Sequence, residues 1–241
     1  MAILSTKAIV ISAIKYSDTS LIAKLYTREA GLSSYMMKGI LKSKKGKLKA
    51  AYFQPLTQLN IVASHQEKRN LQSIREAQVI NMYKTIHSNV IKQSLVLFLS
   101  EMISNSIQEE EPNELLYDYI ESSFLWLDTH DDIANFHLLF LLNLTKFLGF
   151  YPDTINEEKK GFHLREGIFT DQLHEKEVIK GVELTQFKKL LGIHFDSILS
   201  VNFSKKERQD LLEMLIRYFE LHLGGFKNPK SLEVLEAVFS R

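Results

Sequence analysis

The sequence contains no cysteine among its 241 residues. This absence excludes disulfide bonds, thiolate nucleophiles and zinc sites built from cysteine ligands. It also fits a protein of a reducing compartment, so we expect a cytoplasmic location.

Long hydrophobic runs are also missing. The longest apolar window, residues 133–150, includes two asparagines, a histidine and a lysine. A membrane-spanning helix would not carry these polar groups, so the window predicts a buried core helix and no membrane association. The apolar run between Lys7 and Lys15 is seven residues long and has no basic segment before it. A secretory signal is therefore not expected.

Sequence patterns of known catalytic sites are absent as well. A phosphate-binding loop requires two glycines with four residues between them, and the second glycine is followed by Lys and then by Ser or Thr. Here six residues separate Gly39 from Gly46, and Leu48 stands where the hydroxyl is needed. No Gly-x-Gly-x-x-Gly or His-Glu-x-x-His segment occurs, and the eight histidines are scattered. We therefore predict a protein that is not an enzyme and that uses no metal and no cofactor.

What the sequence does have is a segregation of charge. Residues 1–80 contain 13 Lys and Arg against 4 Asp and Glu, whereas residues 81–241 contain 17 against 25. The net charge of the whole chain is only +1, because a basic first part and an acidic second part nearly cancel. This asymmetry predicts that the first part binds a polyanion.

The basic charge is densest in residues 38–49, which hold six lysines and no acidic residue. The six are Lys38, Lys42, Lys44, Lys45, Lys47 and Lys49. Two glycines in this segment disfavour a long helix, so it is expected to form a loop. Such a run is equally compatible with a merely solvated loop, and it is the charge asymmetry that favours binding.

The first 80 residues have the alternation and turn residues of β-strands. Five strands are predicted, at residues 7–14, 21–27, 32–38, 56–63 and 71–80. Short strands with tight turns and one long loop are typical of a small closed barrel, such as the five-stranded oligonucleotide-binding (OB) barrel. An SH3-like barrel fits the pattern too.

From residue 81 the apolar residues recur with helical spacing. Asp131 and Asp132 are predicted to cap a helix that includes residues 136–147, and Ser204 and Glu207 form a capping box for a later helix. Residues 153–181 lose this spacing and predict a small hairpin from residues 162–164 and 168–170. The expected fold class is α+β, with a barrel domain at 1–80 and a helical domain at 81–241 that contains an irregular insert at 153–181.

Two further cations and one aromatic residue join the predicted binding surface. Lys24 and Arg28 lie in or beside the second strand, and Tyr26 is two residues from Lys24, so both side chains share a face. Single-stranded nucleic acid is held by basic grooves together with aromatic side chains that stack on bases. Tyr35 is expected to face the other way, and Phe53 to fill the barrel core.

Several segments resemble one known family. They are residues 8–39, the Phe53-Gln54-Pro55-Leu56 motif, residues 218–224 and Lys230-Ser231-Leu232. In this order they are similar to the bacterial DNA repair protein RecO family. The resemblance implies an OB barrel followed by a helical domain, in a recombination mediator without a catalytic centre that is associated with the nucleoid.

The resemblance also implies partners. Members of this family bind single- and double-stranded DNA and anneal complementary strands. They dock on the C-terminal tail of the single-stranded-DNA-binding protein (SSB) and, with RecR, help load RecA onto coated single strands. Many of them hold zinc through four cysteines in the insert, which this chain lacks. We expect a zinc-ribbon-like insert stabilised instead by apolar contacts of Phe162, Leu164, Ile168 and Phe169.

The acidic helical domain is expected to bind proteins. An apolar groove there would need nearby cations to take an acidic tail, and we assign this role to Lys146, Arg217 and Lys227. Two alternatives remain at this point: an RNA-binding or ribosome-associated OB module, because a basic groove serves RNA as well as DNA, and a protein–protein adaptor with a solvated lysine loop.

Overall fold

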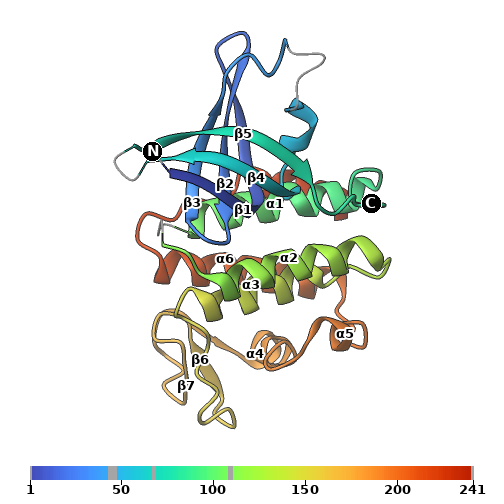
Figure 1. Ribbon diagram of the computed structural model, residues 1–241. Coiled ribbons are helices and arrows are strands. Elements are labelled where there is room, and N and C mark those ends of the chain that lie inside the picture. Colours follow the sequence, from blue (N-terminus) through green and yellow to red (C-terminus); the bar gives the residue numbers. More distant parts are fainter. Residues whose placement is uncertain (1, 43–47, 67–68, 108–110, 240–241) are drawn as a thin grey trace. The chain divides into compact units, whose positions relative to one another are not determined.

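The computed structural model describes residues 2–42, 48–66, 69–107 and 111–239 (Figure 1). Lys44, Lys45 and Lys47 lie outside these ranges. The chain forms two compact units, Met1–Thr129 and His130–Arg241. The first unit extends past the barrel, because it includes helices α1 (Val90–Ser106) and α2 (Glu114–Thr129).

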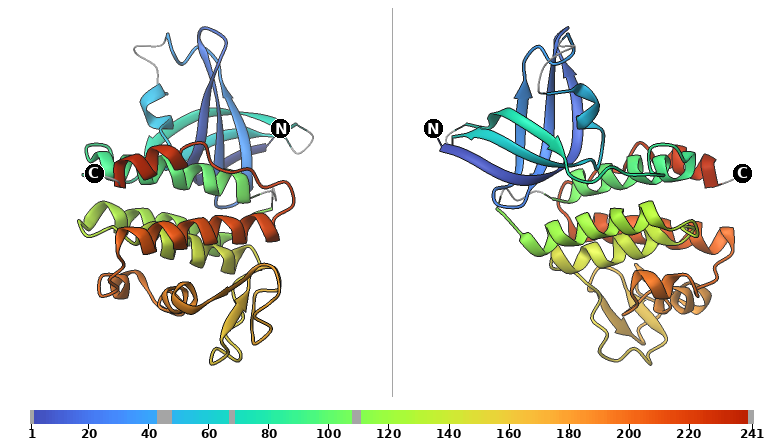
Figure 2. Two further views of the ribbon diagram at one scale, coloured as in Figure 1. Left: turned by 180° about the vertical axis from the view of Figure 1, so that it is seen from behind. Right: turned by 45° about the vertical axis from the view of Figure 1, so that its right-hand side comes forward.

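The five predicted strands form a closed barrel with the order β1-β2-β3-β5-β4 (Figures 1 and 2). The strands are β1 (Ala2–Tyr16), β2 (Ser20–Thr27), β3 (Gly31–Met37), β4 (Gln58–His65) and β5 (Leu71–Val79). Only the β3–β5 pair is parallel. The prediction of a five-stranded OB barrel is confirmed.

Alternate residues of each strand fill the barrel, as the strand period requires. Tyr35 and Phe53 are both buried in this core, as predicted, and Phe53 reaches it from the short 3-10 helix η1 (Ala50–Phe53). A register shift between Val10 and Ser12 marks a β-bulge in β1. Bulges bend a strand, which lets the long β1 pair with β4 along its first half and with β2 along its second.

Polar groups fix the connection between the barrel and its two helices. The Asn89 side chain caps α1 by accepting from the backbone N–H groups of Ile91 and Lys92. Near the end of α2, the Asp128 carboxylate accepts from the backbone N–H groups of residues 84–86, at 2.8–3.0 Å. The fully buried Lys92 ammonium donates to the Thr85 hydroxyl at 2.7 Å. These buried polar groups therefore satisfy one another.

The second unit consists of five helices and a small sheet within the described residues. The helices are α3 (Phe136–Phe147), α4 (Gly181–Lys188), α5 (Phe195–Ile198), α6 (Lys205–His222) and α7 (Leu232–Phe239). The capping box of Ser204 and Glu207 is confirmed. The caps predicted at Asp131 and Asp132 are wrong: Phe136 N–H bonds to Ile133 O, so a turn separates the two carboxylates from α3.

The insert contains the predicted hairpin and a third strand that was not predicted. Strands β6 (Gly161–His163), β7 (Ile168–Thr170) and β8 (Val178–Lys180) have the order β7-β6-β8. Phe162 and Phe169 are buried with ring centroids 5.1 Å apart, and Leu164 is buried too. Ile168 is 44% exposed, so its predicted core role is wrong: it points away from Phe169, its neighbour along the strand.

No group of three or more His, Asp or Glu in the described ranges is placed to hold a metal ion. No helix in the same ranges has the length and apolar character needed to cross a bilayer.

Candidate nucleic-acid interface

A groove of about 500 Å³ lies where the end of β3 meets the start of β5. Lys38 and Arg69 line it, together with the apolar side chains of Met36 and Leu71. The buried Gln72 amide shapes one wall, because its Nε2 donates to the carbonyls of Gln66 and Arg69 at 2.9 and 2.6 Å. These bonds tie Gln66 and Arg69 to the start of β5. The groove combines two cations with the apolar side chains of Met36 and Leu71.

Arg69 was missed in the sequence analysis. The signal for it was present, since residues 68 and 69 form a basic pair in the loop between the fourth and fifth strands. The proximity of Arg69 to Lys38 depends on the parallel pairing of β3 with β5, in which Met36 lies opposite Ser73. Pairing of distant strands has no local sequence signal, so only the barrel closure brings Arg69 and Lys38 to one groove.

The predicted loop lysines within the described residues are open to solvent. Lys38 and Lys42 lie in the turn after β3, where Gly39 has φ +72° and the Leu41 N–H bonds to Thr19 O at 2.9 Å. Lys49 is exposed, with its Nζ 5.8 Å from the centroid of the Tyr52 ring. None of the three lysines has an acidic partner in the described part of the chain.

Lys24 occupies the middle of β2 on the outer face of the barrel. It lies between Ser12 of β1 and Ser34 of β3 in the strand register. Burial lowers the pKa of its ammonium group, and no acidic side chain in the described ranges pairs with it. A phosphate beside Lys24 would stabilise the charged ammonium group by direct attraction, in place of the hydration that the group loses on burial.

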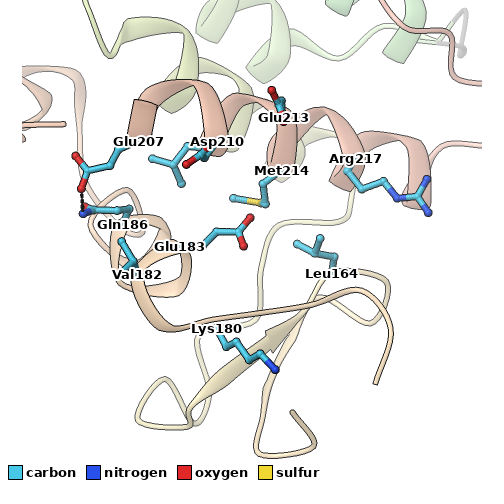
Figure 3. A pocket seen from close by; sticks show the side chains of 11 residues that line it. Leu164, Lys180, Val182, Glu183, Gln186, Glu207, Asp210, Glu213, Met214 and Arg217 are labelled. Carbon is cyan, nitrogen blue, oxygen red and sulfur yellow. Dashed lines mark hydrogen bonds between the residues drawn. The ribbon is translucent and has the colours of Figure 1, made fainter. Parts of the chain in front are cut away.

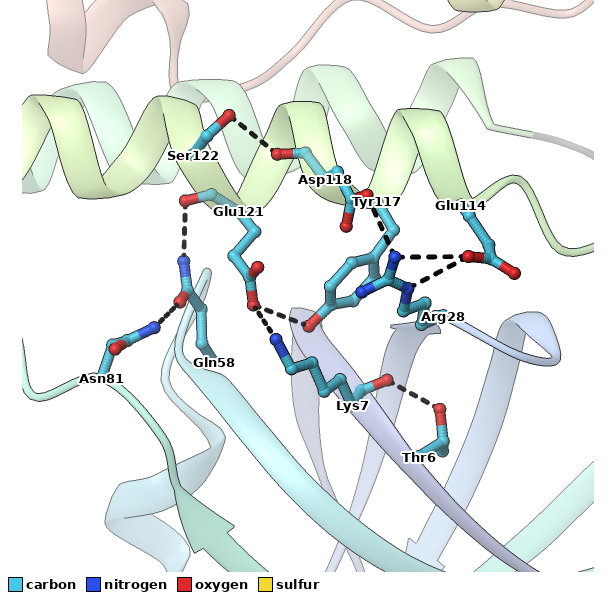
Figure 4. A network of polar contacts seen from close by, with 10 residues as sticks. All are labelled: Thr6, Lys7, Arg28, Gln58, Asn81, Glu114, Tyr117, Asp118, Glu121 and Ser122. Carbon is cyan, nitrogen blue, oxygen red and sulfur yellow. Dashed lines mark hydrogen bonds and ion pairs between the residues drawn. The ribbon is translucent and has the colours of Figure 1, made fainter.

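Arg28 and Tyr26 are turned toward α2 instead. Arg28 lies 3.1 Å from Asp118 and 3.2 Å from Glu114, both on α2 (Figure 4). Tyr26 is 1% exposed, its ring stacks on Tyr117 with centroids 6.4 Å apart, and its hydroxyl donates to Asn113 O. The prediction that Tyr26 stacks on bases is therefore wrong. Lys24 and Tyr26 do share a face, but α2 covers the part that contains Tyr26.

The three cations predicted to bind a partner have different surroundings in the second unit. The Lys146 ammonium lies 4.6 Å from the centroid of the Tyr151 ring, and Lys227 is exposed in the segment after α6. Arg217 forms ion pairs with Glu177 and Glu220, and its hydrogen bonds lower the pKa of Glu177.

Arg217 also borders a groove of about 570 Å³ between α4 and α6 (Figure 3). Four carboxylates line this groove: Glu183, Glu207, Asp210 and Glu213. The carboxylates would repel an acidic peptide, so the assignment of Arg217 to an acidic tail is not supported by its surroundings.

A better match for such a tail is a pocket of about 120 Å³ lined by residues of α3, α6 and α7. Its apolar lining comes from Leu212, Leu235 and Phe239. Lys205 and Arg208 line it from the first turns of α6, against a single carboxylate, that of Glu236. Buried His137 forms part of the lining. Lys205 and Arg208 carry no sequence signal for this role, because they stand in the first turns of a capped helix and only tertiary packing adds the apolar partners.

Comparison with known proteins gave consistent matches along the chain. A family model described as "Recombination protein O N terminal" matches residues 1–83, and one described as "Recombination protein O C terminal" matches residues 87–233. Proteins named DNA repair protein RecO from Christiangramia forsetii and Flavobacterium psychrophilum are each 48% identical over 237 residues, covering 98% of this chain and 99% of theirs. The protein of that name from Bacteroides fragilis is 34% identical over 240 residues, covering 97% and 98%.

Proposed function

The chain belongs to the RecO family of DNA repair proteins, and on that premise we propose that it binds single- and double-stranded DNA as a recombination mediator. It anneals complementary strands and, with RecR, helps load RecA onto single strands coated with SSB. The observation that supports DNA binding most directly is the basic groove. Lys38 and Arg69 line it, and Lys24 lies one strand away, opposite Ser34, without an acidic partner in the described ranges.

The cations of this surface act on phosphates. Each phosphate that they neutralise releases counterions and adds about 0.9 for duplex DNA, or about 0.7 for a single strand, to the slope of log affinity against log salt concentration. Contacts with phosphates carry no sequence information, which suits a protein that acts on any damaged sequence. Screening of the charge on two strands at once lowers their mutual repulsion and favours annealing.

For the acidic, apolar C-terminal tail of SSB, the pocket between α3, α6 and α7 is the better docking site. Leu212, Leu235 and Phe239 would hold an apolar side chain, and Lys205 and Arg208 would pair with carboxylates. This assignment replaces Arg217, which is held by two glutamates.

The DNA proposal is tested by the double variant Lys38→Ala/Arg69→Ala, with Lys176→Ala/Lys230→Ala as a charge-matched control at exposed positions of the second unit. Affinity for fluorescent single-stranded and duplex DNA is measured over a range of salt concentrations. We expect the first variant to bind both DNAs more weakly, with a salt slope reduced by about 1.8 for the duplex and about 1.4 for the single strand, and the control to match the wild type.

Three results would contradict the proposal. An unchanged affinity of the Lys38/Arg69 variant at low salt would favour the adaptor alternative. Preferential competition by RNA of the same sequence would favour an RNA-binding module. Absence of strand annealing, with and without cognate SSB, would contradict the mediator role.

A further inference from the structure

The outer face of the barrel carries an apolar strip that the barrel core does not use. In the strand register, Ile14 of β1 lies opposite Ile22 of β2, and Ile22 lies opposite Met36 of β3. Residues directly opposite in neighbouring strands point to the same side of a sheet. The strip continues to Tyr16, two residues beyond Ile14 along β1, and to Leu71, which lies opposite Ser34 on β5.

These side chains are open to solvent. Ile14 is 61% exposed, Tyr16 52% and Leu71 36%, and Ile22 and Met36 are half-buried. The interior of the barrel is filled by the alternate residues of the same strands. The side chains of the strip therefore do not pack in the core of the barrel. Clustered exposed apolar residues of this kind mark interaction sites.

The charges around the strip favour a polyanionic ligand. Lys24 lies next to the Ile14–Ile22–Met36 row, and Met36 and Leu71 also line the groove that contains Lys38 and Arg69. Asp18 is the one acidic residue between positions 2 and 27. An apolar surface bordered by cations matches the two parts of an unpaired nucleic-acid strand, its bases and its phosphates.

We propose that Ile14, Tyr16, Ile22, Met36 and Leu71 contact the bases of single-stranded DNA, and that this strip gives the barrel its preference for unpaired strands over duplex. The inference rests on the proposed DNA-binding function and extends it to the choice of substrate. Duplex DNA keeps its bases stacked inside the helix, so it reaches the cations alone. A single strand also places bases on the Tyr16 ring and the aliphatic side chains.

This arrangement has a consequence for annealing. When two bound strands pair, their bases leave the strip and stack inside the new duplex. The product is then held by its phosphates alone and is released more readily than either single strand. The strip therefore favours turnover in the direction of annealing.

The test compares three DNA ligands of equal length: an oligo-dT single strand, an abasic strand with the same phosphates but no bases, and a duplex. We expect the wild type to bind oligo-dT on the order of tenfold more tightly than the abasic strand. Tyr16→Ala/Ile14→Ser should bind oligo-dT no better than the abasic strand, with unchanged affinity for the abasic strand and the duplex.

Two controls keep the result specific. Met82→Ser removes an apolar side chain that is 86% exposed in the segment after β5, outside the strip, and should behave as the wild type. Tyr16→Phe keeps the ring and should keep the preference. If the double variant melts at a lower temperature, Tyr16→Ala alone decides the outcome.

Equal binding of oligo-dT and the abasic strand by the wild type would overturn this inference and leave the proposed function intact. A preference retained by the Tyr16 variant would overturn it as well. Weaker binding of the variant to all three ligands would show that the strip does not act on bases. Absence of DNA binding by the wild type would overturn the proposed function itself.

Discussion

The Arg28 guanidinium lies 3.1 Å from the carboxylate of Asp118, and this ion pair joins the β2–β3 turn of the barrel to helix α2. Lys7 makes a similar contact with Glu121 at 3.4 Å (Figure 4). Part of the positive charge of the first 80 residues is thus neutralised inside the first compact unit. Lys24, Lys38 and Arg69 have no acidic partner in the described ranges, so their charges stay available to a ligand.

This division predicts different effects of two single substitutions. Arg28→Ala should leave the affinity for single-stranded DNA within about twofold of the wild type, because its charge is engaged by α2. It should lower the melting temperature at low salt, with a difference that shrinks as salt screens the ion pairs. Lys38→Ala should show the converse, with weaker DNA binding and an unchanged melting temperature. If Arg28→Ala weakened DNA binding as much as Lys38→Ala, Arg28 would belong to the interface.

The pocket beside α6 predicts a position-dependent effect of two neighbouring lysines. Lys205→Ala should weaken binding of an acidic, apolar peptide with the sequence of the cognate SSB tail by a few-fold, because Lys205 lines the pocket. Lys206→Ala, also exposed but absent from the lining, is the matched control and should bind as the wild type. Calorimetry on the full chain measures both. Equal losses in the two variants would indicate a general effect of charge and would argue against docking in this pocket.

Buried His137 predicts a stability change in mild acid. Burial, assisted by the charge of Arg208, lowers the pKa of His137 from its ordinary 6.5 to about 3, so the folded protein holds the neutral ring. The unfolded chain takes up a proton below pH 6.5 and the folded chain does not. The contribution of the buried neutral His137 ring to the free energy of unfolding is therefore fully present above pH 6.5. Below that pH the free energy of unfolding falls by up to about 1.4 kcal/mol per pH unit toward pH 3.

The measurement is the free energy of unfolding of wild type and His137→Leu between pH 4 and pH 8. Other groups titrate in both proteins, so the difference between the two curves isolates His137. We expect this difference to change steadily below pH 6.5 and to be flat above it. Parallel curves through the whole range would show that His137 is accessible to protons in the folded state.

Gly167 predicts a steric cost in the insert. Its φ is +68°, and a Cβ there would lie 2.9 Å from the Tyr218 hydroxyl. That hydroxyl donates to Phe150 O at 2.8 Å and belongs to a buried ring, so it has little room to move. Gly167→Ala should therefore destabilise the protein by about 1–3 kcal/mol in chemical denaturation.

A matched control is Gly192→Ala, because Gly192 also has a positive φ (+70°) but no atom within 4 Å of an added Cβ. The control should carry the backbone cost alone, about 1 kcal/mol or less. Equal effects of the two substitutions would mean that the contact with Tyr218 relaxes without cost.

The elements themselves were predictable to within a few residues. Alternation along β2 and the helical spacing in α6 are local patterns, so they do not depend on distant parts of the chain. The hairpin of β6 and β7 was predicted because its turn residues lie within the segment. Strand β8 was missed, since three residues in register with β6 carry no signal of their own.

The binding residues were only partly predictable. Alternation correctly placed Tyr26 and Lys24 on one face, but exposure of that face depends on Tyr117, 91 positions along the chain from Tyr26. The sequence contains no local signal that marks Tyr16 as a contact residue, because its apolar neighbours Ile22 and Met36 come from the adjacent strands. Arg69 approaches Lys38 through barrel closure.

Composition and periodicity alone determined that this chain has a basic barrel followed by helices, because charge content and apolar spacing are properties of short segments. Tertiary structure decided which cations remain available to a ligand, because neutralisation is a matter of which carboxylate lies within a few ångströms. The Arg28–Asp118 contact spans 90 positions of the chain, a distance over which no local pattern carries information.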